Sequence, residues 1–105
     1  MSSAARLEAL SLPEFGMPEE MPEVPAAVFR DRLARLRERA AGSGFDLLAV
    51  YGDREHSAGL AYLTGFDPRF EEALLVLGPD GDPALLVGNE CFGLAGAAPV
   101  PLRRR

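Results

Sequence analysis

The 105-residue sequence contains no lysine, and it has a single cysteine and a single histidine. All eleven of its basic residues are therefore arginine, which we interpret as a coding bias rather than a binding device. Cys91 alone cannot form an internal disulfide, so a reducing cytoplasm is the expected setting. His56 alone is too little for a metal hydrolase site, which needs several N, O or S ligands from different elements. We therefore expect no metal site and no cofactor in this chain.

The sequence also lacks long apolar runs and the short motifs of common catalytic sites. Nothing approaches the roughly 18 continuous apolar residues of a membrane span, and no apolar core follows the N-terminus. No glycine-rich phosphate loop, nucleophilic serine elbow or cysteine pair occurs. A net charge of -5 argues against a general affinity for nucleic acid or anionic membrane. These absences predict a cytoplasmic chain that is not an enzyme by itself and binds neither nucleic acid nor membrane.

Residues 1–24 predict an extended, acidic, proline-rich arm. Prolines and glutamates dominate its composition: Pro13, Pro18, Pro22, Glu8, Glu14, Glu19, Glu20 and Glu23. Large apolar residues are scattered among them at irregular spacing: Leu10, Leu12, Phe15, Met17 and Met21. A mobile leader is the favoured interpretation, because termini are poorly ordered unless tied down. The alternative is that the arm docks into a groove on a partner domain or subunit.

A helical period begins at Pro25, a residue suited to the first helical position because it lacks an N–H. The apolar residues Phe29, Leu33, Leu36 and Ala40 follow at spacings of four, three and four, which places them on one helix face. Gly42-Ser43-Gly44 is expected to end the helix. The arginines between the apolar positions could suggest phosphate binding, but interleaved acidic residues favour an ordinary solvated face.

Three apolar runs predict the strands of an α/β fold with a mixed sheet. Residues 47–51 are bounded by turn residues and are expected to be covered on both faces. Residues 73–77 and 84–88 flank a connector rich in Pro, Asp and Gly, which predicts an antiparallel hairpin and a plain turn rather than a calcium loop. Residues 57–61 could start a short helix, which Gly65 should end by adopting a left-handed conformation.

The run Tyr62-Leu63-Thr64-Gly65-Phe66, together with the order of these elements, resembles the N-terminal domain of the creatinase, prolidase and aminopeptidase P family. The similarity covers roughly residues 25–91 and implies a mixed sheet with flanking helices. In that family, catalysis resides in a following domain, where two Asp, one His and two Glu hold a pair of divalent metal ions. By this comparison residues 25–105 are an incomplete N-terminal domain, the chain ends inside that domain, and the catalytic domain is absent.

The resemblance also implies an assisting role for the connectors on either side of this run. In family dimers, the N-terminal domain of one subunit reaches toward the catalytic cleft of another and helps to close its pocket. Carried onto this sequence, the substrate-pocket candidates are Asp53, Arg54, His56, Asp67, Arg69 and Phe70. Arg54 or Arg69 could grip a substrate carboxylate through its planar fork, and Phe70 could exclude water. The expected partner is another copy of the chain or a full-length relative.

Simpler interpretations stand beside this one. His56 could be a helix-start residue satisfied by backbone, Cys91 a core thiol at the end of a buried strand, and Tyr62, Leu63 and Phe66 ordinary core residues. Two other functions stay open: a stand-alone interaction module, and a small-molecule binding protein that uses Arg54, His56 and Arg69. The arginines at 103–105 fit either a basic tail for an acidic partner or a truncated end.

Overall fold

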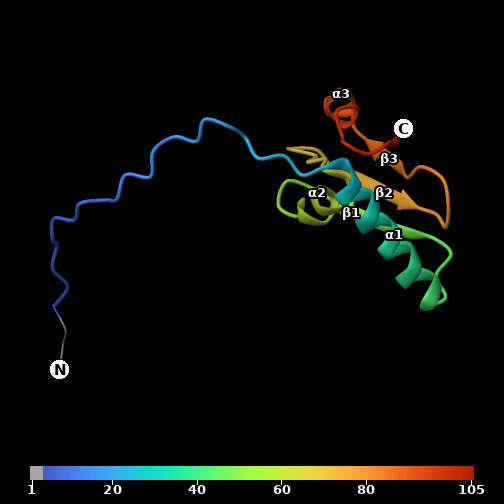
Figure 1. Cartoon of the computed structure of the whole chain (residues 1–105), viewed down its shortest axis with the longest axis horizontal. Coiled ribbons are helices and arrows are strands. Elements are labelled where there is room, and N and C mark those ends of the chain that lie inside the picture. The colour runs from blue at the N-terminus through green and yellow to red at the C-terminus, as the bar shows by residue number, and fades with distance from the viewer. Residues whose placement is uncertain (1–3) are drawn as a thin grey trace.

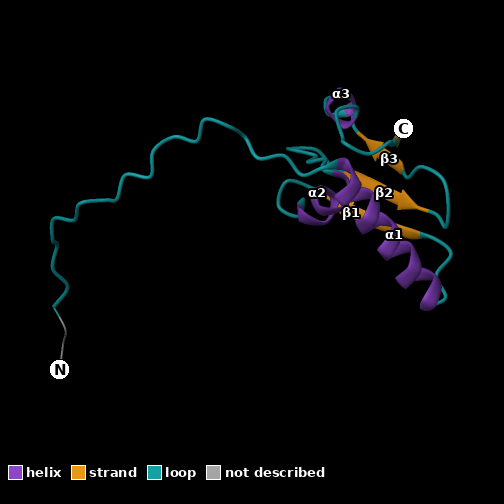
Figure 2. Ribbon diagram, in the orientation of Figure 1, coloured by secondary structure: helices purple, strands orange, loops and turns teal. Residues whose placement is uncertain are grey.

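The structure, a computed structural model, describes residues 4–105. The elements follow one another in this order: α1 (Ala26–Gly42), β1 (Leu48–Gly52), α2 (Ala58–Thr64), β2 (Ala73–Leu77), β3 (Ala84–Val87), α3 (Phe92–Ala95) and β4 (Arg103–Arg104). Figure 1 and Figure 2 show one sheet with the helices packed against it and a long N-terminal segment leading away. The predicted α/β fold with a mixed sheet is confirmed.

The sheet has the strand order β1-β2-β3-β4. β1 and β2 are antiparallel, with Leu48 opposite Leu77 at one end and Gly52 opposite Ala73 at the other. β2 and β3 form the predicted antiparallel hairpin, whereas β4 pairs with β3 in parallel. No sequence pattern predicts β4, because this strand is only two arginines long and both are exposed.

Helix α1 lies on the sheet through the predicted apolar face. Phe29 and Leu33 are buried, and Leu36 and Ala40 are half-buried. The helix begins one residue later than expected, because Pro25 has extended backbone (φ -58°, ψ 144°) and precedes the first helical residue. The position of α1 is also fixed by Arg37, whose Nε donates a hydrogen bond to the carbonyl oxygen of Gly78 at 2.9 Å.

Only one face of the sheet is covered. Along β2, Ala73, Leu75 and Leu77 are buried, whereas the residues between them are only half-buried. The expectation that residues 47–51 are covered on both faces is therefore wrong: Tyr51 is 49% exposed, and Leu47 is exposed and precedes the strand. We call the uncovered side the open face; strand alternation places on it Leu47, Ala49, Tyr51, Leu74, Val76, Ala84 and Leu86.

The short helix α2 seals the core and then reverses the chain. Leu60, Leu63 and Thr64 are buried, and the helix ends at Gly65, whose φ of 73° is the left-handed conformation expected there. Leu63 and Phe66 are core residues as predicted. Tyr62 is not, since its side chain is 57% exposed. Its outer position lets the Arg32 guanidinium stack 4.1 Å from the ring centroid.

Residues 4–24 contain neither helix nor strand, and they run away from the domain (Figure 1). Their large apolar side chains are almost fully exposed: Leu7, Leu10, Leu12, Phe15, Met17 and Met21. The arm therefore contributes nothing to the core of its own domain.

Candidate functional site

The connectors that carry the predicted site residues meet at one end of the sheet. Gly52, the last residue of β1, pairs with Ala73, the first residue of β2, and Ala73 also pairs with Val87 at the end of β3. The segments 53–57, 65–72 and 88–91 therefore leave the sheet at this end, which we call the connector end. Every predicted pocket residue lies on the first two of these segments.

Asp53 organises the first connector. Its Oδ1 accepts hydrogen bonds from the backbone N–H groups of Glu55 (2.9 Å) and His56 (2.7 Å) and lies 2.9 Å from His56 Nδ1. Partial desolvation opposes ionisation of Asp53, but the hydrogen bonds from His56 and Tyr51 outweigh it and lower the pKa of this carboxyl group. His56 therefore bonds to a side chain rather than to backbone alone, which corrects the simpler interpretation of this residue.

Tyr51 links the first connector to the second. Its hydroxyl lies 3.1 Å from Asp53 Oδ2 and 3.1 Å from Glu72 Oε1, so it can donate to either carboxylate. Partial burial, with these two carboxylates beside it, raises the pKa of Tyr51 to about 12. Sequence reasoning missed both Tyr51 and Glu72, because it treated residue 51 as part of a strand buried on both faces. Strand alternation places Tyr51 on the opposite face from Leu48 and Val50, but only the packing of the helices decides which of the two faces is covered.

The second connector is a tight turn built on Asp67. Its Oδ1 accepts a hydrogen bond from the backbone N–H of Arg69 (2.8 Å), and Arg69 has a φ of 59°, uncommon for a residue other than glycine. Phe70 follows and is 64% exposed. The turn thus presents a cationic and an aromatic side chain in succession at the connector end.

The structure does not gather all candidates into one pocket. Arg69 and Asp67 line a cavity of about 170 Å³ with the two residues that follow α2 and with residues of the α3 region, and neither Arg54 nor His56 belongs to its lining. Asp53 with His56 and Asp67 with Arg69 are two separate pairs. The cavity at Arg69 therefore includes neither of the other two residues of the small-molecule site expected at Arg54, His56 and Arg69.

Cys91 belongs to the core rather than to a nucleophilic site. It is fully buried, and its Sγ donates to the carbonyl oxygen of Pro68 at 3.1 Å. Burial, with the Glu71 carboxylate nearby, raises the pKa of the thiol. The predicted core thiol is confirmed, but its predicted place at the end of a strand is wrong: β3 ends at Val87, and Cys91 precedes the first residue of α3.

Within residues 4–105, no group of three or more His, Cys, Asp and Glu side chains is placed to hold a metal ion. None of the helices in this range is long and apolar enough to cross a membrane. The side chains at the connector end can bind charged or apolar groups and can exclude water. Activation of a water molecule by metal ions would require ligands from elsewhere.

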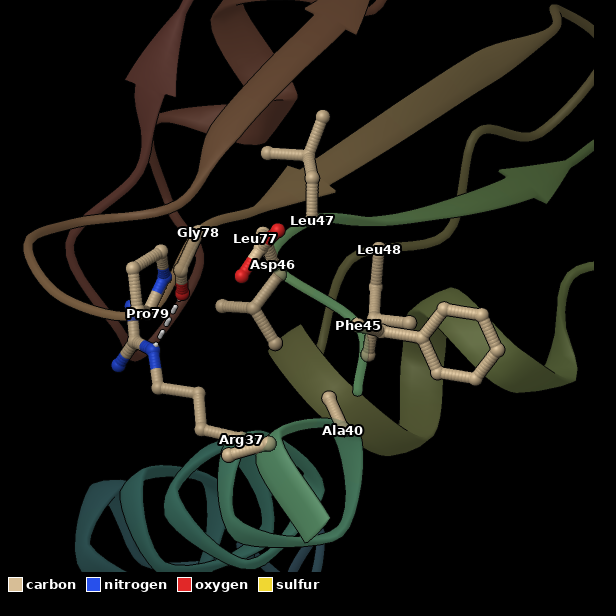
Figure 3. A pocket seen from close by; sticks show the side chains of 10 residues that line it. Arg37, Ala40, Phe45, Asp46, Leu47, Leu48, Leu77, Gly78 and Pro79 are labelled. Carbon is tan, nitrogen blue, oxygen red and sulfur yellow. Dashed lines mark hydrogen bonds between the residues drawn. The ribbon is translucent and has the colours of Figure 1, made fainter. Parts of the chain in front are cut away.

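A small pocket lies at the opposite end of the sheet, where α1 packs against the β2–β3 hairpin. Figure 3 shows it between α1 and the start of β1, with Arg37 reaching across to Gly78. Leu47 points away from α1 in this view. The cavity measures only about 80 Å³. We interpret it as the seam between the helix and the hairpin rather than as a binding site.

No family model matches this sequence, and no curated protein matches it. Several solved structures do match the fold. A proline dipeptidase from Streptococcus agalactiae aligns with a TM-score of 0.57 and 25% identity, over 72% of this chain and 57% of that one. The creatinase/prolidase N-terminal domain of an X-Pro dipeptidase from Streptococcus pyogenes aligns with a TM-score of 0.54 and 26% identity, over 69% and 54%.

A dipeptidase from Mycobacterium ulcerans is similar in fold alone, with a TM-score of 0.58 and 19% identity over 80% of this chain and 24% of that one. The present chain spans little more than half the length of the streptococcal structures. The resemblance first seen in the Tyr62–Phe66 run is confirmed: this chain has the fold of a creatinase/prolidase N-terminal domain.

Proposed function

We propose that the chain is a non-catalytic part of an Xaa-Pro peptidase or creatinase-like metallohydrolase, which contributes to dimerisation and closes the substrate pocket of a partner subunit. One observation carries this proposal: the connectors 53–57 and 65–72 leave the same end of the sheet, so their side chains can face one neighbouring surface together. The structural neighbours that are Xaa-Pro dipeptidases support the substrate class.

The side chains at the connector end match the chemistry of a dipeptide that ends in proline. Arg54 and Arg69 are exposed, and a guanidinium group binds a carboxylate through two parallel hydrogen bonds. Phe70 offers an exposed aromatic ring that can cover a pyrrolidine ring and exclude water from it. Asp53 and Asp67 shape the connectors that present these groups.

The open face supports the association of the chain. Tyr51, Leu74 and Leu86 line a shallow apolar depression of about 540 Å³ on this face. The solvated face of an antiparallel sheet is ordinarily polar, whereas the open face leaves apolar side chains partly in water, and a domain of this size buries little surface. We therefore propose that the isolated chain is dimeric or larger, or partly molten.

The proposal assigns no step of the hydrolysis to this chain. The metal pair of the resembled family would be held by Asp, His and Glu ligands of a following domain. When bound there, the metals would activate water and polarise the scissile carbonyl. The residues described here would position the substrate and shield it.

The coding sequence that follows the codon for Arg105 tests the proposal. Codons for spaced Asp, Asp, His, Glu and Glu would support it, and a stop codon would contradict it in favour of a stand-alone interaction module. In a longer protein with those ligands, Arg69→Ala should raise KM for Xaa-Pro dipeptides with little change in kcat, as expected when uniform binding is lost. Arg30→Ala, on the exposed side of α1, is the matched control.

A further inference from the structure

A row of arginines lines a groove between α1 and α2. Arg32, Arg35 and Arg39 follow one another at spacings of three and four along α1, which places them on one helix face. With Leu36, Tyr62 and Leu63 they enclose a cavity of about 200 Å³, which we call the arginine groove. Its walls are cationic, and its floor is apolar.

The arginine groove is held in shape before any ligand arrives. Arg32 stacks on the Tyr62 ring and donates a hydrogen bond to the Tyr62 carbonyl oxygen at 2.9 Å. Arg35 pairs with Asp31, at 2.9 Å from Nε, so one of the arginines is partly neutralised. The whole helix still carries five arginines against Asp31 and Glu38, a net charge of +3 in a chain whose net charge is -5.

The arm has the complementary chemistry. Residues 4–24 carry five glutamates and one arginine, and their large apolar side chains are unburied. Met21 lies between Glu20 and Glu23, so an apolar side chain alternates with carboxylates. In extended backbone Glu20 and Glu23 are separated by about 10 Å. Arg35 and Arg39 lie about 6 Å apart along the helix axis, a difference that the long, flexible Arg and Glu side chains can bridge.

The arm does not lie in the arginine groove of its own chain, because it runs away from the domain with its apolar side chains exposed (Figure 1). Glu23 lies three residues before Ala26, so it reaches at most about 10 Å back along the helix. Arg39 lies about 20 Å from the start of α1, which is beyond the reach of Glu23 and at the limit of the reach of Glu20, six residues before Ala26. Pro22 and Pro25 stiffen the junction, and the arm leaves the domain in an extended direction (Figure 1).

We propose that the arm of one copy of this chain lies in the arginine groove of a second copy, with Glu20 and Glu23 against Arg35 and Arg39. A two-fold axis makes the exchange reciprocal. If α1 lies perpendicular to that axis, the two helices run antiparallel and each arm can continue along the α1 of its partner. The proposal rests on the dimerisation part of the proposed function. The arm and the arginine groove form this interface, and the connector end stays free.

Reversing the charges tests this pairing in the full chain. One variant carries Glu20→Arg and Glu23→Arg, and the other carries Arg35→Glu and Arg39→Glu. Each should dimerise at least about tenfold more weakly than the wild type by sedimentation velocity, because every arm then meets a groove of like charge. An equimolar mixture should regain dimers, since a heterodimer has attractive pairs in both of its grooves.

Glu8→Arg, in a residue paired with Arg6 within the arm, and Arg30→Glu, outside the arginine groove, should leave the dimer intact. Far-ultraviolet circular dichroism checks that every variant keeps its helices. If both charge-reversal variants remain dimeric, the arm pairing is wrong but the proposed dimerisation is not contradicted. Two monomeric variants that stay monomeric when mixed would overturn the exchange between copies. A wild type that is a partly molten monomer would overturn the arm pairing alone, and a well-folded monomer with a sharp near-ultraviolet signal would overturn both proposals.

Discussion

The carboxylate of Glu71 accepts a hydrogen bond from the backbone N–H of Cys91 at 3.0 Å, and its other oxygen lies 3.4 Å from the backbone nitrogen of Glu90. The contact joins the connector before β2 to the segment that enters α3. In this contact the Glu71 carboxylate lies directly against the backbone of Gly88, because a Cβ at that position would be 2.5 Å from Glu71 Oε1. Two of the segments at the connector end are therefore locked together by one side chain.

Gly88→Ala should lower the free energy of unfolding by about 1–3 kcal/mol, because the added methyl group displaces the Glu71 carboxylate from its backbone donors. Urea unfolding followed by circular dichroism measures the change. Gly93→Ala is the control, since a Cβ there meets nothing within 4 Å; inside α3 it should leave the stability unchanged or raise it by up to about 1 kcal/mol. A Gly88→Ala variant as stable as the wild type would show that the Glu71 contact contributes nothing.

The sequence was sufficient for features set by local spacing and insufficient for those set by tertiary contacts. The apolar period of α1, the hairpin from Ala73 to Val87 and the left-handed Gly65 follow from spacing and residue type. Which side of β1 is covered cannot be predicted from spacing and residue type, because it depends on which helices pack on the sheet. The contact between Tyr51 and Glu72 joins residues 21 positions apart, so no local pattern reports it.

Cys91 should react with a thiol reagent only when the domain opens, since the side chain is fully buried and its pKa is raised. At pH 8 the native chain should therefore label at least about a hundredfold more slowly than the chain in concentrated urea, if local opening at this site costs about 3 kcal/mol. Absorbance of the released reagent gives both rates. Rapid labelling of the native chain would contradict the buried position.

The pKa of the Tyr51 hydroxyl group should be higher than that of an ordinary tyrosine. In a Tyr62→Phe background it is the only tyrosine, and the phenolate absorbance should rise with a midpoint at about pH 12. Because the folded-state pKa is raised, the stabilisation is complete below about pH 10 and is lost as the pH rises toward 12. Asp53→Asn should move the midpoint toward 10, because one carboxylate is removed. An unchanged midpoint would exclude Asp53 as a cause.

The purified chain should hydrolyse no Xaa-Pro dipeptide and should bind no divalent metal ion tightly, since residues 4–105 bring no three potential ligands together. Calorimetric titration with Mn²⁺ or Zn²⁺ measures binding, and an assay for released proline measures hydrolysis. A stoichiometric site of micromolar affinity or better would overturn the non-catalytic assignment.

The open face should drive association beyond the dimer. Leu86 is 45% exposed on this face, so Leu86→Glu removes apolar area there at little cost to the core. We expect this variant to show smaller species by light scattering at high concentration, with a melting temperature close to that of the wild type. Leu94→Glu, at an exposed leucine of α3 away from the open face, should leave the size distribution unchanged. If the wild type is instead a monodisperse monomer with a sharp near-ultraviolet signal and cooperative melting, the open face needs no cover and these residues form a complete domain.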